Sequence, residues 1–139
     1  MSNHAVGDIL PTVPFQADGM QVITSNVATL DFYPGLIDTD FARQAGVETV
    51  FMNTMTLQSL MNRYVLDWAP SGRIVWHEIA MRKPAYAGVA LEISGEIIAV
   101  SDYAGSSVVG PGKELVVSLK IVGGGDLRTV GKVAVVIPA

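Results

Sequence analysis

The stretch from Met55 to Trp68 constrains the fold of this chain more than any other part of its sequence. Its apolar residues recur three or four positions apart, at Leu57, Leu60, Met61, Tyr64, Val65 and Trp68. This spacing predicts an amphipathic helix that buries one face. Asn53 or Thr54 can cap its start, and Pro70-Ser71-Gly72 ends it. The rest of the chain must supply the apolar surface that covers this face.

Four runs rich in β-branched residues follow Gly72, and turn signals separate them. They predict strands over residues 73–81, 89–100, 115–122 and 128–137. Gly95 lies near the middle of the second run, where we expect a bend or bulge. Gly123-Gly124-Gly125-Asp126 predicts a hairpin loop between the last two strands. It does not match a phosphate-binding loop, because no Lys-Ser/Thr and no helix follow it.

The first third of the chain is less regular. We expect residues 1–16 to form an extended arm over the surface, and residues 20–28 to form a short strand or the lead-in to a turn. Pro34-Gly35 indicates a turn, and residues 38–45 a short helix that Gly46 ends. Residues 1–139 therefore predict one α+β domain, with the long helix in the concave face of a curled antiparallel sheet.

Composition excludes several classes of function. The chain has no cysteine and only two histidines, His4 and His77, so it lacks the residues for a thiol nucleophile, a Cys-ligated metal or a three-histidine site. A formal net charge of −4 argues against a nucleic-acid partner. With no cysteine and two histidines, we expect no metal. We expect no membrane partner, because no apolar run approaches 20 residues. We expect a cytoplasmic location, because Met1–Leu10 does not resemble a signal peptide.

The apolar content is high for a small domain. Half of the residues are apolar, 16% are charged and the mean hydropathy is +0.40. A surface this poor in charge predicts that a subunit interface covers part of it. We therefore expect an obligate dimer, either a homodimer or a hetero-oligomer.

Several short segments, spread over nearly the whole chain, match one family pattern. They are Val6–Pro11, Asp31–Pro34 with Asp38 and Phe41–Gly46, Phe51–Met55, and Lys83–Gly88. Together they resemble the MaoC-like hot-dog family of (R)-specific enoyl-CoA hydratases and dehydratases. Phe51, Asn53 and the run Arg63–Trp68 are similar to the branch of that family that hydrates steroid side chains. The resemblance implies a hot-dog fold, with the sheet wrapped around the long helix, and no cofactor.

The resemblance also implies roles for individual residues. In the family an aspartate and a histidine five positions later share one water and add it to the double bond of an enoyl thioester. Asp31 matches the aspartate, whereas Leu36 stands at the histidine position and Tyr33 at that of an asparagine. Asp31 is then the expected base, and a water or Tyr33 the second catalytic group. The expected substrate contacts are Leu36, which fills space, and Asn53 and Thr54, where the helix N-terminus receives the thioester oxygen.

Each of these residues also has a structural interpretation. Asp31 precedes a Pro-Gly turn, and Asn53 and Thr54 suit a helix cap. His77 alternates with apolar neighbours on a strand, which is typical of a structural histidine. Four basic residues are candidate contacts for the phosphates of coenzyme A: Arg63, Arg73, Arg82 and Lys83.

Three functions therefore stay open. The first is a lyase that hydrates or dehydrates an acyl-CoA or acyl-carrier-protein thioester. The second is a non-catalytic hot-dog subunit that pairs with an active partner, because the histidine of the dyad is missing. The third is a hot-dog acyl-CoA thioesterase that uses Asp31 and a water.

Overall fold

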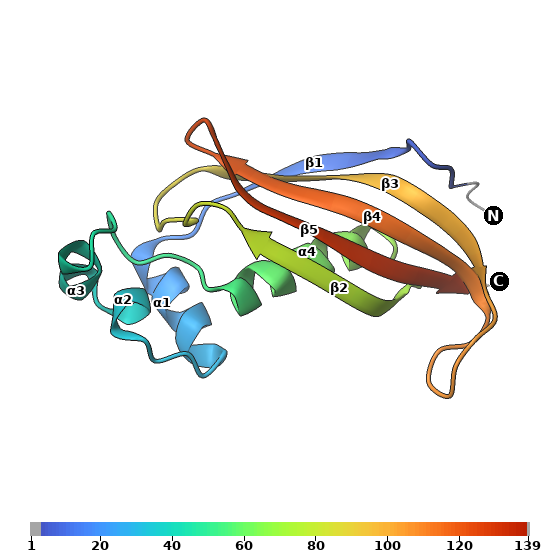
Figure 1. Ribbon diagram of the computed structural model, residues 1–139, viewed down its shortest axis with the longest axis horizontal. Coiled ribbons are helices and arrows are strands. Elements are labelled where there is room, and N and C mark those ends of the chain that lie inside the picture. Colours follow the sequence, from blue (N-terminus) through green and yellow to red (C-terminus); the bar gives the residue numbers. More distant parts are fainter. Residues whose placement is uncertain (1–3, 139) are drawn as a thin grey trace.

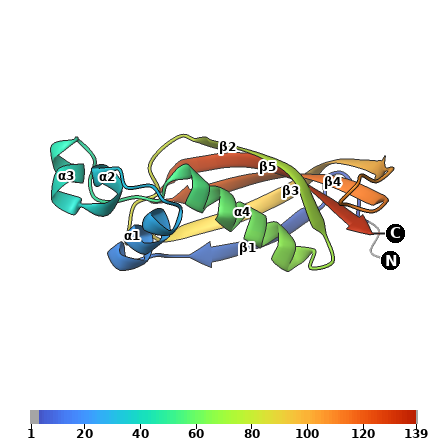
Figure 2. The ribbon, with the colours of Figure 1, turned by 90° about the horizontal axis from the view of Figure 1, so that it is seen from below.

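The computed structural model describes residues 4–138. Its elements follow in the order β1 (Ile9–Phe15), α1 (Gly19–Ala28), α2 (Pro34–Ile37), α3 (Thr39–Gln44), α4 (Thr54–Trp68), β2 (Arg73–Met81), β3 (Leu91–Tyr103), β4 (Gly112–Gly123) and β5 (Asp126–Pro138). The strands form one antiparallel sheet in the order β1-β3-β4-β5-β2, and α4 lies along its concave face (Figures 1 and 2). This confirms the predicted α+β architecture.

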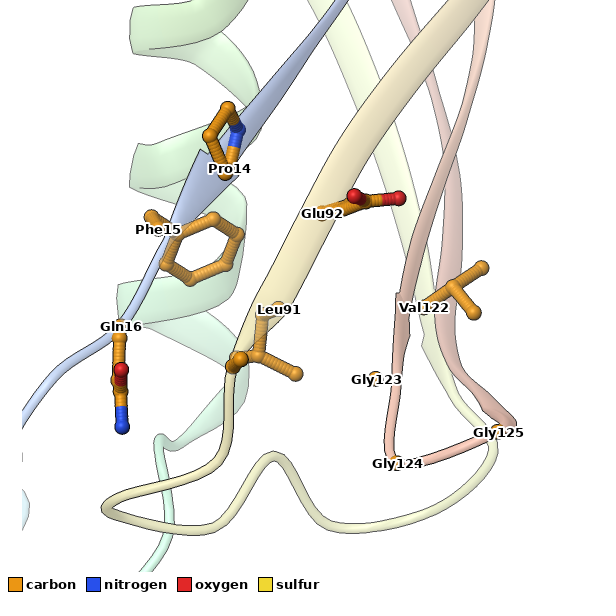
Figure 3. A pocket seen from close by; sticks show the side chains of 10 residues that line it. Pro14, Phe15, Gln16, Leu91, Glu92, Val122, Gly123, Gly124 and Gly125 are labelled. Atoms are coloured by element: carbon orange, nitrogen blue, oxygen red, sulfur yellow. The ribbon is translucent and has the colours of Figure 1, made fainter.

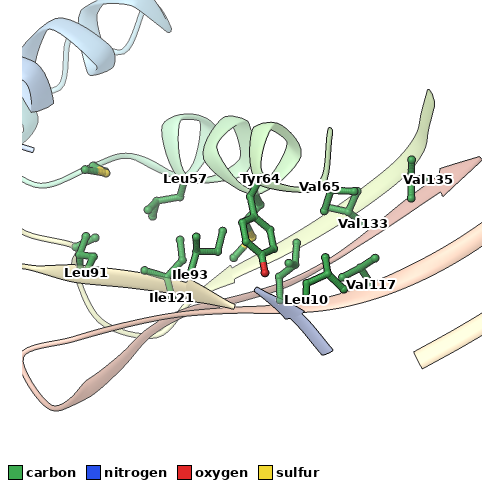
Figure 4. Packing of buried hydrophobic residues seen from close by; sticks show 14 of the residues in the cluster. Leu10, Leu57, Tyr64, Val65, Leu91, Ile93, Val117, Ile121, Val133 and Val135 are labelled. Carbon is green, nitrogen blue, oxygen red and sulfur yellow. The ribbon is translucent and has the colours of Figure 1, made fainter. Parts of the chain in front are cut away.

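The helix α4 provides one side of the hydrophobic core. Its residues Leu57, Met61, Tyr64 and Val65 are buried, as the apolar spacing predicts. They face buried side chains of the sheet, among them Ile93, Val117, Ile121, Val133 and Val135 (Figure 4). Burial of side chains of this size stabilises the fold by about 1.5–3 kcal/mol each. The helix and the sheet therefore depend on one another for their stability.

The predicted strand or turn over residues 20–28 is wrong, because this segment is the helix α1. A capping box starts it: the Asp18 carboxylate accepts the Gln21 N–H at 2.8 Å, and the Gln21 side chain accepts the Asp18 N–H at 2.9 Å. Val22 and Asn26, four positions apart, are its two buried residues. The cap and this spacing prevail over the β-preference of the individual residues.

The surface arm predicted for residues 1–16, of which residues 1–3 lie outside the described residues, is also wrong in part. Residues 9–15 form the edge strand β1, which pairs with β3. The irregularity expected near Gly95 is present in the pairing of β1 with β3, where the register shifts between Leu10, opposite Gly95, and Val13, opposite Ile93. The register of β3 against β4 also shifts, between Ile97 and Ala99. Gly95 is required for packing, because a Cβ there would lie 2.9 Å from Leu119 Cδ2 and 3.3 Å from Tyr64 Cε1.

The other predicted elements are present, with small changes at their ends. The strand over residues 73–81 matches β2. β3 starts two residues later and ends three residues later than predicted, and β4 and β5 extend beyond the predicted bounds at both ends. Asp38 caps α3 by accepting the Asp40 and Phe41 N–H groups, and Gly46 follows that helix with φ of 89°. The short helices α1, α2 and α3 gather at one end of the sheet, beside the start of α4 (Figures 1 and 2).

Candidate active site

Asp31 and Asn53, two of the predicted site residues, are in direct contact. The Asn53 side chain is 5% exposed, and its Nδ2 donates to Asp31 Oδ2 at 3.0 Å and to Thr29 Oγ1 at 2.7 Å. Its Oδ1 accepts the Thr56 N–H at 2.8 Å and so caps α4. One amide therefore joins the start of α4 to a carboxylate 22 residues earlier in the chain.

The position of Asp31 is set by an unusual helix end. Helix α1 ends in a Schellman motif, in which Leu30 N–H donates to Val27 O at 2.9 Å and Asp31 N–H donates to Asn26 O at 3.1 Å. The residue in the left-handed conformation is normally glycine, but here it is Leu30, with φ of 58° and 78% exposed. This turn places the half-buried Asp31 carboxylate beside Asn53.

The N-terminus of α4 has backbone donors free beside this carboxylate. The Thr54 and Met55 N–H groups lie in the first turn, where a helix offers no internal acceptor, and no group in residues 4–138 accepts them. Thr54 itself is exposed and begins the helix. Helix α4 has 15 residues, and its dipole favours negative charge at this end. The two N–H groups are therefore suited to an oxygen that gains negative charge.

The Tyr33 backbone N–H donates to Asp31 Oδ1 at 3.4 Å, whereas the Tyr33 ring points to other partners. Tyr33 is 52% exposed and packs edge-on against the Phe41 ring, with centroids 6.0 Å apart. Its ring also covers Gly35, where a Cβ would lie 2.6 Å from Tyr33 Cε1. Leu36 is buried in α2, 4% exposed, and supplies no acid or base. The structure thus brings Asp31, Asn53 and the start of α4 together, with Tyr33 at the surface.

Two residues that contact the site are absent from the predicted set. Thr29 Oγ1 donates to Asn26 O at 2.8 Å and accepts from Asn53, so it lies between α1 and α4. Asn26 is fully buried, and its Oδ1 accepts the Asn53 N–H at 3.0 Å. The sequence signal for Asn26 is its place four residues after Val22 on the buried face of α1, which depends on identifying residues 19–28 as a helix.

Two of the four basic residues proposed for coenzyme A are paired with carboxylates. Arg63 Nε contacts Asp67 Oδ1 at 2.6 Å, and Lys83 Nζ contacts Asp126 Oδ1 at 2.6 Å. His77, expected to be structural, is exposed and its Nδ1 contacts the Asn62 side chain at 2.9 Å. None of these contacts involves Asp31 or Asn53.

Two cavities lie away from Asp31. The first, about 480 Å³, lies at the end of the sheet and is lined by Pro14–Gln16, Ala90–Glu92 and Val122–Gly125 (Figure 3). The second, about 310 Å³, lies between β1 and α4, and Arg63, Tyr64, Asp67 and Trp68 are among its lining. Arg63, a candidate contact for coenzyme A, lines the second cavity. The predicted catalytic and substrate-binding residues line neither cavity. Asp31 and the start of α4 therefore form an open site on the single chain.

Three exposed apolar side chains lie next to the site residues in the sequence. Leu30, Phe32 and Met55 are 78%, 60% and 54% exposed, and they flank Asp31 and Asn53 along the chain. Exposed apolar groups in such number mark surfaces that a partner or a ligand covers. Within residues 4–138 no helix is long and apolar enough to cross a membrane, and no group of three His, Cys, Asp or Glu side chains is placed to hold a metal ion.

The arrangement suits chemistry on a carbonyl compound. A carboxylate can accept a proton from water, and two free N–H groups can stabilise an oxyanion formed on the substrate. Asp31 and the start of α4 are close enough to act on one substrate, because Asn53 contacts the first and caps the second.

A comparison with known protein sequences finds a relative among hydratase subunits. The chain is 36% identical over 98 residues to the 3-oxo-4,17-pregnadiene-20-carboxyl-CoA hydratase beta subunit of Mycobacterium tuberculosis, covering 70% of this chain and 76% of that protein. No protein-family model matches the chain.

Solved structures agree with this relationship. A chain of the ChsH1-ChsH2 complex from Mycobacterium tuberculosis superposes with a TM-score of 0.85 and 28% identity, covering 99% of both chains. An (R)-hydratase from A. caviae involved in PHA biosynthesis gives a TM-score of 0.82 at 18% identity, covering 99% of this chain and all of the other. A MaoC-like dehydratase from Rhodospirillum rubrum gives 0.78 at 15% identity, covering 100% and 97%. The last two comparisons show the fold alone.

Proposed function

We propose that this chain, which belongs to the MaoC-like hot-dog family, forms part of a hydratase or dehydratase that acts on an enoyl-CoA thioester. The single observation that carries the proposal is the contact of Asp31 Oδ2 with the Asn53 amide at the start of α4. This contact supports a role for Asp31 as base beside the start of α4, because the same Asn53 side chain caps that helix. The name of the mycobacterial relative, a CoA-thioester hydratase subunit, supports the same class of substrate.

In the proposed hydration the Asp31 carboxylate accepts a proton from a water molecule. The resulting hydroxide oxygen bonds to C3 of the enoyl thioester, and the electron pair of the double bond moves to the thioester oxygen. The Thr54 and Met55 N–H groups donate to that oxygen as it becomes negative. The enolate then takes a proton at C2, and the carbonyl reforms. Dehydration follows the same steps in reverse.

The proton for C2 needs a donor, because Leu36 has none. The Asp31 carboxyl group carries the proton that it took from water, and it returns that proton to C2 from the same side. The Tyr33 hydroxyl and a second water are the other candidate donors, and Tyr33 packs by its ring against Phe41. An enzyme in which one side chain acts as both acid and base is expected to be slower than one with two such side chains by about 10²–10⁴-fold, the usual contribution of a general acid or base.

Turnover of enoyl-CoA substrates by the purified chain tests the proposal. Crotonyl-CoA, a longer enoyl-CoA and a steroid enoyl-CoA are supplied in turn, and loss of the conjugated double bond is followed by absorbance. We expect Asp31→Asn to lose the activity and Tyr33→Phe to keep it. Turnover equal in the chain and in Asp31→Asn contradicts the proposal. Release of free CoA from saturated acyl-CoA would identify a thioesterase instead, because hydration leaves the thioester intact.

One observation favours a second function: position 36, where the resemblance implies an acid–base group, carries a buried leucine. A chain of this kind can pair with another hot-dog subunit that carries a complete catalytic dyad. Both mycobacterial relatives bear names of multisubunit proteins, a beta subunit and a two-component complex. Co-expression with a hot-dog subunit that has the dyad distinguishes the two functions. Activity that needs the partner and is unaffected by Asp31→Asn supports a purely structural pairing role.

A further inference from the structure

Asn26 is a buried polar residue that hydrogen-bonds to two segments beyond its own helix. Its side chain is fully buried, and its Nδ2 donates to Leu36 O at 3.0 Å and to Phe51 O at 2.8 Å. Its Oδ1 accepts the Asn53 N–H at 3.0 Å. Both amide hydrogens and the carbonyl of the side chain are therefore satisfied by backbone groups.

The backbone of Asn26 contacts the site as well. Its carbonyl oxygen accepts the Asp31 N–H at 3.1 Å and the Thr29 hydroxyl at 2.8 Å. One residue thus bonds directly to Asp31, to Leu36 and to Asn53, which come from three separate segments. No other residue among 4–138 makes hydrogen bonds to all three.

We infer that Asn26 is the positioning residue of this site, and that it sets the distance between the Asp31 carboxylate and the start of α4. Asp31 lies in the turn that follows α1, whereas Asn53 caps the start of α4, and the segment between them contains the short helices α2 and α3. The three side-chain bonds of Asn26 hold both ends of that segment to α1. This inference rests on the proposed function for its kinetic consequence only.

Packing alone does not explain an asparagine at this position. An amide transferred into an apolar interior without partners is strongly unfavourable, and even a fully bonded amide adds little net stability compared with an apolar side chain. Its hydrogen bonds do give direction, since each fixes one backbone group relative to α1. A misplacement of about 1 Å between catalytic groups lowers a rate by about 10²-fold. A catalytic site therefore requires directional bonds that fix the positions of its groups.

Two variants of Asn26 and one matched control test the inference. Asn26→Leu keeps the volume and removes all three side-chain bonds. Asn26→Asp keeps the shape and the acceptor for Asn53 N–H, and loses both donors. Asn62→Leu is the control, because Asn62 is an asparagine of α4 whose side chain contacts His77 of β2 and no residue of the site. Thermal unfolding reports whether each variant is folded.

The first measurement is the NMR signal of the Asn53 side-chain amide, which requires no turnover. We expect Asn26→Leu to shift this signal and to speed its hydrogen exchange, Asn26→Asp to do so to a smaller extent, and Asn62→Leu to leave it unchanged. An unchanged Asn53 signal in folded Asn26→Leu overturns the inference. If Asn26→Leu does not fold, an unchanged signal in Asn26→Asp has the same meaning.

The second measurement is the split between kcat and KM for an enoyl-CoA. We expect Asn26→Leu to lower kcat by about 10²-fold while KM stays nearly constant, because the reacting groups move and the surface that binds the substrate does not. A loss of kcat equal to that of Asn62→Leu overturns the positioning role. If the unmodified chain shows no turnover at all, the proposed function fails, and the Asn53 signal alone decides the role of Asn26.

Discussion

Replacing Leu36 by histidine tests the proposed chemistry most directly. The family resemblance implies a histidine at this position, one that shares a water with the aspartate, and this chain has a buried leucine there, 4% exposed. The segment that bears it is already fixed, because Leu36 O accepts the Asn26 side chain at 3.0 Å. Leu36→His therefore places an imidazole on a backbone that Asn26 joins to Asp31 and Asn53.

The expected gain in rate is larger than the expected loss in stability. A positioned general acid contributes about 10²–10⁴-fold, which lowers the barrier by about 3–5 kcal/mol. Loss of the leucine and burial of a polar ring cost about 1–3 kcal/mol of folding free energy. A domain with a free energy of unfolding of about 5–15 kcal/mol remains folded after that loss. We therefore expect Leu36→His to be folded, less stable and faster.

The assay follows hydration of an enoyl-CoA across pH, beside two controls. Leu36→Gln introduces a polar group of similar size that does not titrate, and Leu36→His combined with Asp31→Asn removes the base. We expect the rate of Leu36→His to show an inflection between pH 5 and 8 that the unmodified chain lacks. A folded Leu36→His no faster than Leu36→Gln refutes the assigned roles of Asp31 and position 36.

Four further outcomes follow from the structure. Leu30→Gly is expected to raise the free energy of unfolding by about 1 kcal/mol, seen as a higher Tm, because leucine is strained at a φ of 58°; a lower Tm contradicts this. Gly95→Val is expected to lower the free energy of unfolding by about 1–3 kcal/mol or more in denaturant titrations, because the valine Cβ would lie 2.9 Å from Leu119 Cδ2. Burial raises the pKa of the Tyr64 hydroxyl above its ordinary value near 10, and a hydrogen bond with the Gly95 backbone opposes this shift. The unfolded chain then releases the proton first, so stability should fall as pH rises above about 10, and Tyr64→Phe should remove that dependence. Sedimentation at micromolar concentration should give a dimer, and a stable monomer would count against the interface predicted from the apolar content.

The fold was predictable where one pattern dominated. The apolar spacing of Leu57, Met61 and Val65 identified α4, and runs of β-branched residues identified the last four strands. Helix α1 was missed because its β-branched residues predict a strand, whereas the capping box that indicates a helix involves only two side chains, Asp18 and Gln21. Edge strand β1 was missed because its two prolines lie in a strand that has a neighbour on one side only, where a missing N–H is tolerated.

The site was predictable only in its residue types. The sequence places Asp31 and Asn53 far apart, and their contact arises from the Schellman turn at Leu30 together with the cap of α4. A leucine in the left-handed conformation has no sequence signal, because that position usually favours glycine. Asn26 could not be recognised as part of the site while residues 20–28 were expected to form a strand or turn.

Two buried amides explain how the proposed site keeps its shape. A core stabilised by packing alone favours apolar side chains at positions 26 and 53, because each amide must find a partner for every polar atom. In this chain Asn26 and Asn53 do find them, and all of the partners belong to the ends of α1, α2 and α4 or to the strand bridge at Phe51. Such a network adds little stability but specifies one arrangement of segments. Under the proposed function, Leu36 supplies no acid or base while the two amides keep the geometry that such a group needs. Introducing an imidazole at position 36 and disrupting Asn26 are therefore expected to change the rate in opposite directions.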